Sequence, residues 1–257
     1  MKISQVAIQL YTLRDFTKTL EDFTETCRKV KEIGYQAVQV SAIGPIADED
    51  VRKVVEDHGL TLCATHEAGK SILEDPAGVA KKLERLGTRY TAYPYPDTTY
   101  FESLEKLGEL AAKLDEAGKV LRDHGKVLTY HNHHIEFMKI GGTTVLDYFI
   151  EHCDPVNLQY ELDTYWVQYG GGNNVEYAQL LKGRLPLLHL KDFRITEERQ
   201  IAFSEIGEGN LNFKTIIPAA EASGCEWFIV EQDSCPGNPF DSITKSFEYI
   251  QGNLVQG

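Results

Sequence analysis

Short β-rich runs, each preceded by a helix-like segment and a glycine, constrain the fold of this chain more than any other feature. The pattern is clearest in IGYQAVQV, HGLTLCAT, LGTRYTAY, HGKVLTYH and SGCEWFIVE. A glycine just past a helix adopts the left-handed conformation that ends it at little steric cost. The Val, Ile, Leu, Tyr and Thr runs that follow are typical of buried parallel strands, which need not alternate strictly. The sequence therefore indicates helices and parallel strands in alternation.

Eight such β-rich runs occur along the 257 residues, and their starts lie about 25 to 40 residues apart with helical patterns between them. They lie at 3–9, 35–41, 60–66, 88–93, 126–131, 156–162, 185–191 and 226–231. Eight β–α units in about 250 residues predict a single-domain (β/α)8 TIM barrel over 1–257. A doubly wound open sheet is the alternative, but neither GxGxxG after the first run nor GxxxxGK[ST] occurs to support it.

The amino-acid composition excludes some classes of binding partner. The chain has 26 basic and 39 acidic residues, a net charge of −13, so no general field attracts phosphate backbones or anionic membrane surfaces. Its five cysteines are widely spaced without a CxxC pair, which favours free thiols in a reducing cytoplasm. We expect a cytoplasmic protein that acts on a small molecule, with no nucleic acid or membrane partner. Homo-oligomerisation stays open.

Polar side chains end four successive predicted strands of the second half of the chain. These residues are His131, Asp163, His189 and Glu231. Each alone is typical of a helix cap or a hydrogen-bonded polar group, but the carboxyl ends of barrel strands meet at one face. Two imidazoles and two carboxylates there suit one divalent metal ion, and the ligand types do not choose among Mn²⁺, Co²⁺, Zn²⁺ and Mg²⁺. The sequence therefore predicts a metal site at this face.

Six motifs spread over the whole chain point to a family. They are AIQLYTLRD, YHNHHIEF, LDTYW, HLKD, IGEGNLNF and VEQD. Together they resemble the sugar phosphate isomerase/epimerase family with the xylose isomerase-like TIM barrel, which includes ketose 3-epimerases and inosose dehydratases. The resemblance implies one divalent ion held by the ends of strands 5 to 8, and Asp163, His189 and Glu231 match its ligands.

The strand 5 position departs from the epimerase pattern. The resemblance implies a glutamate there, which acts with the strand 8 glutamate as the acid/base pair, but this chain has His131. This version looks more like the inosose dehydratase branch. Glu136, five residues on, could restore a carboxylate as ligand or base. We expect Glu231, Glu136 and Lys191 to be the catalytic residues, with Lys191 on the same side of its extended run as His189.

Five further residues are candidates for substrate binding. His66 ends the third strand, His133 shares the inward direction of His131 by the period-two rule, and Gln9 follows the first strand. Trp166 and Tyr93 offer aromatic faces that suit the apolar side of a sugar ring. The alternative roles are barrel packing for Gln9, packing between a loop and a helix for Trp166, and for His133 a hydrogen bond that orients a metal ligand.

These features together predict an enzyme. We expect a divalent-metal-dependent sugar isomerase or epimerase, in which a base removes a proton next to the carbonyl of a ketose or related polyol through a metal-stabilised enediolate. An inosose dehydratase-like lyase and a non-catalytic sugar-binding barrel are the alternatives. An AP endonuclease on the same barrel needs a basic face for DNA, which the net charge of −13 opposes.

Overall fold

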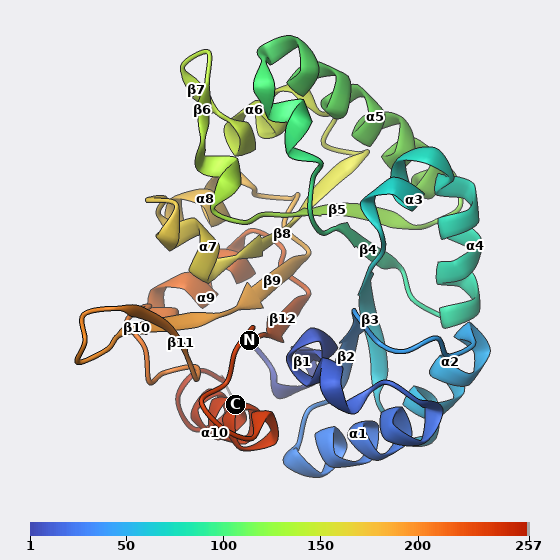
Figure 1. Cartoon of the computed structure of the whole chain (residues 1–257), viewed down its shortest axis with the longest axis vertical. Helices are drawn as coiled ribbons and strands as arrows, with labels where there is room; N and C mark the ends of the chain where they lie inside the picture. Colours follow the sequence, from blue (N-terminus) through green and yellow to red (C-terminus); the bar gives the residue numbers. More distant parts are fainter. Residues whose placement is uncertain (256–257) are drawn as a thin grey trace.

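The computed structural model describes residues 1–255 and confirms the predicted barrel (Figure 1). Eight parallel strands close in the order β1-β12-β9-β8-β5-β4-β3-β2. They are β1 (Val6–Gln9), β2 (Ala37–Val40), β3 (Thr61–His66), β4 (Tyr90–Tyr93), β5 (Val127–His131), β8 (Leu158–Asp163), β9 (Leu187–Leu190) and β12 (Trp227–Val230). Each strand overlaps its predicted range, and five of the eight follow the helix–glycine pattern.

Helices surround the barrel, as Figure 1 shows. They are α1 (Leu20–Ile33), α2 (Asp48–Asp57), α3 (Gly69–Glu74), α4 (Pro76–Leu86), α5 (Leu104–Asp123), α6 (Val145–His152), α7 (Thr164–Tyr169), α8 (Asn174–Leu180), α9 (Phe213–Ala222) and α10 (Pro239–Asn253). The 3-10 turns are η1 (Ile3–Gln5), η2 (Leu10–Phe16), η3 (Thr98–Glu102) and η4 (Ile135–Phe137). Helix α5 shows why they pack: Leu107, Leu110, Leu114 and Leu121 recur at helical spacing and are fully buried. Each such leucine stabilises the fold by about 1.5–3 kcal/mol.

Glycine ends α4 as the sequence pattern predicts. Gly87 has a φ of 74°, in the left-handed region, and its N–H donates to the carbonyls of Leu83 and Glu84. A side chain at this position would strain the backbone. The chain can therefore turn from α4 directly into β4.

Two small antiparallel hairpins, which the sequence analysis did not predict, interrupt the β–α alternation. They are β6 (Lys139–Ile140) with β7 (Thr143–Thr144), and β10 (Asp192–Ile195) with β11 (Ile201–Ser204). The Asp192 carboxylate accepts backbone N–H groups of Gly207, Gly209 and Leu211 and so holds the IGEGNL segment beside β10. A Cβ at Gly209 would lie 2.2 Å from Asp192 Oδ1, so only glycine fits there.

The interior of the barrel changes from apolar to polar along its axis. Inward-facing residues are two apart on a strand, so each step of two residues leads to the next inward position along the barrel axis. The apolar layer includes Ala7, Ala37, Leu187 and Ile229, and the polar layer two residues later includes Gln9, Gln39, His189 and Glu231. The carboxyl ends of the strands therefore enclose a buried polar region.

Candidate metal and substrate site

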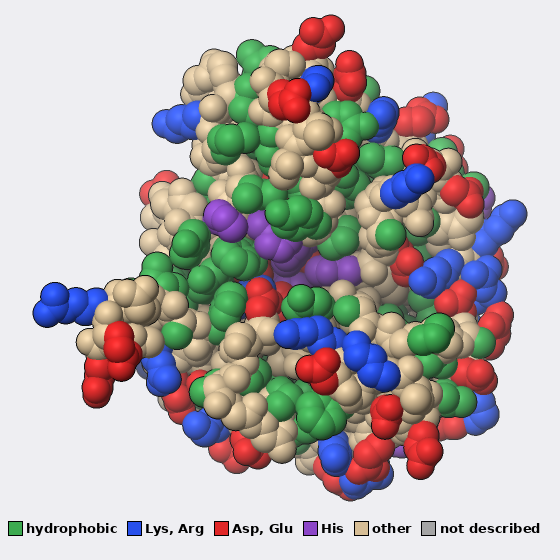
Figure 2. Space-filling view, viewed as in Figure 1, with side chains coloured by type: hydrophobic (Ala, Val, Ile, Leu, Met, Phe, Trp, Pro, Cys, Tyr) green, Lys and Arg blue, Asp and Glu red, His purple; other side chains and the backbone are tan. Residues whose placement is uncertain are grey.

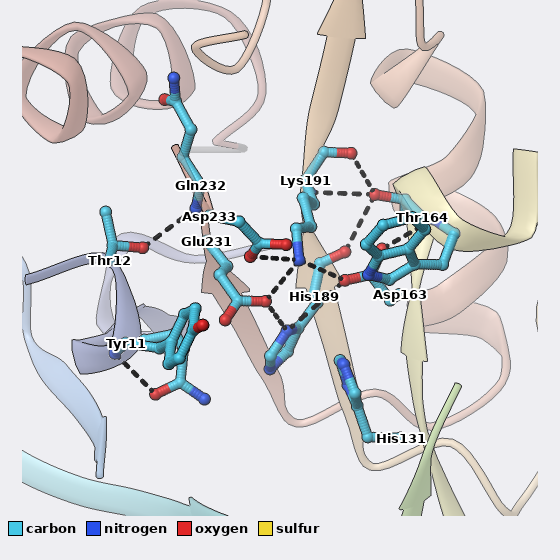
Figure 3. Close-up of polar contacts among 12 residues, drawn as sticks. Tyr11, Thr12, His131, Asp163, Thr164, His189, Lys191, Glu231, Gln232 and Asp233 are labelled. Atoms are coloured by element: carbon cyan, nitrogen blue, oxygen red, sulfur yellow. Dashed lines mark hydrogen bonds and ion pairs between the residues drawn. The ribbon is translucent and has the colours of Figure 1, made fainter. Parts of the chain in front are cut away.

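The four predicted strand-end residues lie together at the carboxyl end of the barrel (Figure 3). His131, Asp163, His189 and Glu231 each offer one ligand atom, and these atoms all lie within 4.8 Å of one another. All four side chains are buried. We call these four residues the upper cluster.

Asp163 has one carboxylate oxygen that caps a helix and one without a hydrogen-bond partner. Oδ1 accepts the backbone N–H of Trp166 at 2.9 Å and so caps α7. Oδ2 is buried and has no hydrogen-bond partner. Burial raises the pKa of Asp163 to about 7, although Lys191 and His189 lower it. A cation would satisfy this oxygen, so the residues present fit a metal ion.

The His189 ring is oriented by its neighbours. Gln39 Oε1 accepts a hydrogen bond from Gln9 Nε2 at 2.9 Å, and His189 Nε2 lies 2.7 Å from the same oxygen. Because that oxygen can only accept, Nε2 carries a proton and Nδ1 is the nitrogen available to a metal. Nδ1 lies 3.0 Å from Glu231 Oε2 and 3.8 Å from Asp163 Oδ2. The two amides therefore direct His189 toward the upper cluster.

Lys191 places a buried ammonium beside these carboxylates. Nζ lies 2.6 Å from Asp233 Oδ1, 3.0 Å from Glu231 Oε2 and 3.5 Å from Asp163 Oδ2 (Figure 3). Burial alone would lower the pKa of Lys191, but the three carboxylates together raise it above its ordinary value. The ammonium is thus charged at neutral pH and can donate hydrogen bonds.

A cavity of about 250 Å³ opens above the upper cluster. It is lined by Tyr11, Ser41, His66, Pro94, Tyr95, His131, His133, Lys191, Glu231 and Asp233. Figure 2 shows histidine side chains gathered in the central hollow of this face, with acidic side chains beside them. This volume lies below the range for drug-sized ligands and suits a small polar molecule.

Most predicted site residues lie at or directly beside this cavity. His66, His133, Lys191 and Glu231 line it. Trp166 packs behind them, with its ring centroid 5.5 Å from that of His133 and 5.3 Å from Lys191 Nζ. This position gives Trp166 a cation–π contact with the buried ammonium.

Three predicted residues, Gln9, Tyr93 and Glu136, lie elsewhere. Gln9 is fully buried and donates to Gln39, so it supports the floor of the site and does not line the cavity. Tyr93 is 2% exposed and packs against Tyr130, because the inward–outward alternation of β4 turns it toward the helices. Tyr95, beyond Pro94, lines the cavity instead.

Glu136, predicted as a base or ligand, also lies away from the cavity lining. The η4 turn directs its carboxylate back into its own loop, where Oε1 accepts from the Tyr130 hydroxyl and Oε2 from the His133 N–H. Both oxygens are thus engaged. The structure gives Glu136 the position of a residue that fixes the loop carrying His133.

Sequence reasoning missed Glu161 and Asp233. Glu161 is fully buried in β8, and its Oε1 lies 2.5 Å from His66 Nε2, 3.0 Å from His189 Nε2 and 3.1 Å from His131 Nδ1. We call His66, His131, Glu161 and His189 the lower cluster. Period-two spacing was the available signal, since Glu161 precedes Asp163 by two residues and Asp233 follows Glu231 by two.

Comparison with known proteins agrees with this architecture. Residues 27–252 match the model of the xylose isomerase-like TIM barrel family. The chain belongs to that family. Among curated proteins of similar sequence, an inosose dehydratase of Geobacillus thermodenitrificans is 29% identical over 167 residues, which are 58% of this chain and 52% of that protein. The chain spans little more than half the length of the curated relatives it matches.

Solved structures share the barrel. A sugar phosphate isomerase/epimerase from Parabacteroides distasonis superposes with a TM-score of 0.85 at 23% identity, over 98% of this chain and 95% of that one. An L-ribulose 3-epimerase gives a TM-score of 0.73 at 15% identity, over 99% and 95%. At these identities the likeness shows the family fold alone. Within residues 1–255, none of the helices has the length and apolar character needed to cross a membrane.

Proposed function

We propose that this chain is a divalent-metal-dependent enzyme that removes a proton next to the carbonyl of a ketose or keto-cyclitol. One observation carries the proposal. The upper cluster borders the same small cavity that Glu231 and Lys191 line as carboxylate and ammonium, 3.0 Å apart. Metal ligands, a base and an acid thus lie around one cavity the size of a small sugar.

Each charged group of the site has a separate role in the proposed reaction. When bound at His131, Asp163, His189 and Glu231, the ion would polarise the substrate carbonyl and so make the neighbouring C–H more acidic. Glu231 lines the cavity as a carboxylate and takes that proton. Lys191 remains charged among its carboxylates and can donate a proton to an oxygen of the substrate.

The arrangement around the barrel supports an epimerase or isomerase. In the closed strand order, β4 lies directly opposite β12, with β3 and β5 on either side of it. His66 ends β3 and His133 follows β5, so their imidazoles face Glu231 across the cavity. A proton removed by Glu231 on one face of the substrate can be returned from the other face by an imidazole, which inverts the carbon.

A lyase is the second candidate, and a specific contact favours it. Lys191 Nζ lies 3.0 Å from Glu231 Oε2, so an acid and a base are available on the same side of the cavity. Removal of the α-proton by Glu231 and protonation of a β-hydroxyl by Lys191 would eliminate water. The matched curated relatives are named inosose dehydratases, which fits this outcome. A non-catalytic sugar-binding barrel would bind ligand in the same cavity without moving protons.

The test is solvent exchange. The protein is loaded separately with Mn²⁺, Co²⁺, Zn²⁺ or Mg²⁺ and incubated in D₂O with a panel of ketoses and inososes, and NMR follows the carbons beside the carbonyl. We expect deuterium at that carbon, with an epimer or isomer as product for the first candidate and an unsaturated ketone for the lyase. Substitution E231Q should abolish exchange. Ligand binding by the ion-loaded protein without exchange on any substrate would contradict the proposal and favour the binding barrel.

A further inference from the structure

We propose that the lower cluster is a second divalent-cation position, beneath the first, with His131 and His189 shared between the two. This inference rests on the metal site of the proposed function and adds to it two residues, His66 and Glu161, as ion ligands. The cation it would take is a nitrogen-preferring transition ion such as Zn²⁺ or Co²⁺.

Ligand atoms converge on one point in the lower cluster. One nitrogen from each of three imidazoles lies 2.5–3.1 Å from Glu161 Oε1. His131 is 2% exposed, and its Nδ1, although 3.1 Å from that oxygen, has no hydrogen-bond partner. An unpaired buried nitrogen aimed at a carboxylate and two further imidazoles is the arrangement that an ion completes.

His189 has one nitrogen directed to each cluster. Nδ1 faces Glu231 and Asp163, and Nε2 lies 3.0 Å from Glu161 Oε1. In the ion-free protein the Nε2 proton is accepted by Gln39 Oε1, and a cation that binds Nε2 replaces that proton. Gln39 Nε2 donates to Glu161 Oε2 at 2.6 Å, which turns Oε1 toward the imidazoles.

The carboxylates of the two clusters provide negative charge for cations. Glu161, Asp163, Glu231 and Asp233 lie in or beside the clusters, and Lys191 contacts three of them. Only Asp233 is appreciably exposed. Uncompensated buried charge is costly, so bound cations stabilise this arrangement.

The two positions differ in ligand chemistry. The lower cluster offers three imidazole nitrogens and one carboxylate, whereas the upper offers two imidazoles and two carboxylates. Nitrogen-rich sites favour Zn²⁺ and Co²⁺, and Mn²⁺ and Mg²⁺ are held best by oxygen-rich ones. We therefore expect Co²⁺ to fill both positions and Mg²⁺ to fill at most the upper one.

The test counts ions. Chelator-treated protein is dialysed against Co²⁺, and bound cobalt per chain is measured by elemental analysis and by visible absorption. We expect two ions in the wild type, one in E161Q, one in D163N and two in the control E67Q, whose carboxylate instead contacts Lys82. If E161Q folds poorly, H66N provides the same test, because His66 lies at the rim of the cavity. We expect one bound ion in H66N as well.

The possible results distinguish a failure of the second ion position from a failure of the metal site in the proposed function. One ion in the wild type that E161Q and H66N retain overturns the second position and leaves the proposed function intact, with Glu161 only accepting hydrogen bonds from His66 and Gln39. No bound ion in the wild type overturns both. One ion that E161Q loses and D163N keeps supports the lower position and contradicts the upper one.

Discussion

The polar layer of the barrel has a neutral half and an ionisable half. Strands β1 and β2 contribute the amides of Gln9 and Gln39, both fully buried. Strands β5, β8, β9 and β12 instead lead to imidazoles, carboxylates and an ammonium; these are His131, Glu161, Asp163, His189, Lys191 and Glu231. Both halves lie at the carboxyl end of one closed sheet, so the choice of side chains makes them different.

The neutral half orients the side chains of the ionisable half. A buried amide carries no charge, and its two ends have opposite hydrogen-bonding roles. Gln9 donates to Gln39, which donates to Glu161 and accepts from His189. The neutral half therefore fixes the direction of the charged groups, and the ionisable half binds the cation and moves protons. Three substitutions test this division, in order of decreasing effect, and a fourth tests a residue outside both halves.

The largest effect is expected for D163N, because loss of the ion would weaken binding and stop catalysis together. Asparagine keeps the Oδ1 that caps α7 but replaces the unpartnered anionic oxygen. We expect ion affinity to fall by at least about 100-fold, since even residues that only orient a ligand change it by 10–100-fold. Equilibrium dialysis with Mn²⁺ and Co²⁺ measures the change. D154N is the matched control, because Asp154 Oδ1 likewise accepts a backbone N–H but lies outside the site; equal affinity in both variants would remove Asp163 from the ligand set.

K191M should separate catalysis from ion binding. Loss of the ammonium removes the proposed proton donor, so we expect kcat to fall by about 100- to 10,000-fold on any substrate found by solvent exchange. Ion affinity should stay equal or rise, because the ammonium no longer competes for Glu231 and Asp163. A variant with unchanged kcat, or one that loses its ion, would show that Lys191 serves the site differently.

A smaller effect is expected in the neutral half. Q39L removes the hydrogen bonds to Gln9, Glu161 and His189 without altering any charge. We expect ion affinity to fall by about 10-fold, as for loss of an outer partner of a metal-binding histidine. Q159L in β8, where Gln159 borders a cavity away from the clusters, serves as control. Wild-type affinity in Q39L would mean that the amides do not orient the ligands.

Glu136 lies outside both halves, and E136Q should change how the free energy of unfolding depends on pH. Burial raises the pKa of Glu136 to about 7 from 4.5, so the folded state keeps its proton while the unfolded state loses it. Between these pH values the free energy of unfolding of the wild type should therefore fall as pH rises, by at most about 3 kcal/mol from this group. E136Q should flatten that slope in urea unfolding series at pH 4.5 and pH 7.5. The exposed Glu151 of α6 provides the control E151Q; identical slopes in all three proteins would rule out the raised pKa.

The fold was predictable because five of the eight barrel units repeat the same local signals. Glycine marks the end of a helix and a short apolar run marks the buried strand, as at Gly87 before β4. The hairpins β6–β7 and β10–β11 were missed because they are short and exposed in part, without a core face to impose a pattern.

The site was predictable only where it lay at a strand end. His131, Asp163, His189 and Glu231 follow apolar runs, and the closed sheet brings them together; their role as metal ligands stays a prediction. Glu161 lies inside a strand, where its neighbours in space belong to β3, β5 and β9 and are invisible in the sequence. Glu136 depended on the direction of a 3-10 turn, which residue spacing does not give.

Anomalous diffraction from crystals of the Co²⁺-loaded protein tests the central claim most directly. The account predicts a cobalt peak bound by His131, Asp163, His189 and Glu231, at the end of the barrel where the four strand ends meet. The second position predicts another peak among His66, His131, Glu161 and His189. A fully loaded crystal whose cobalt lies outside both clusters would contradict the account.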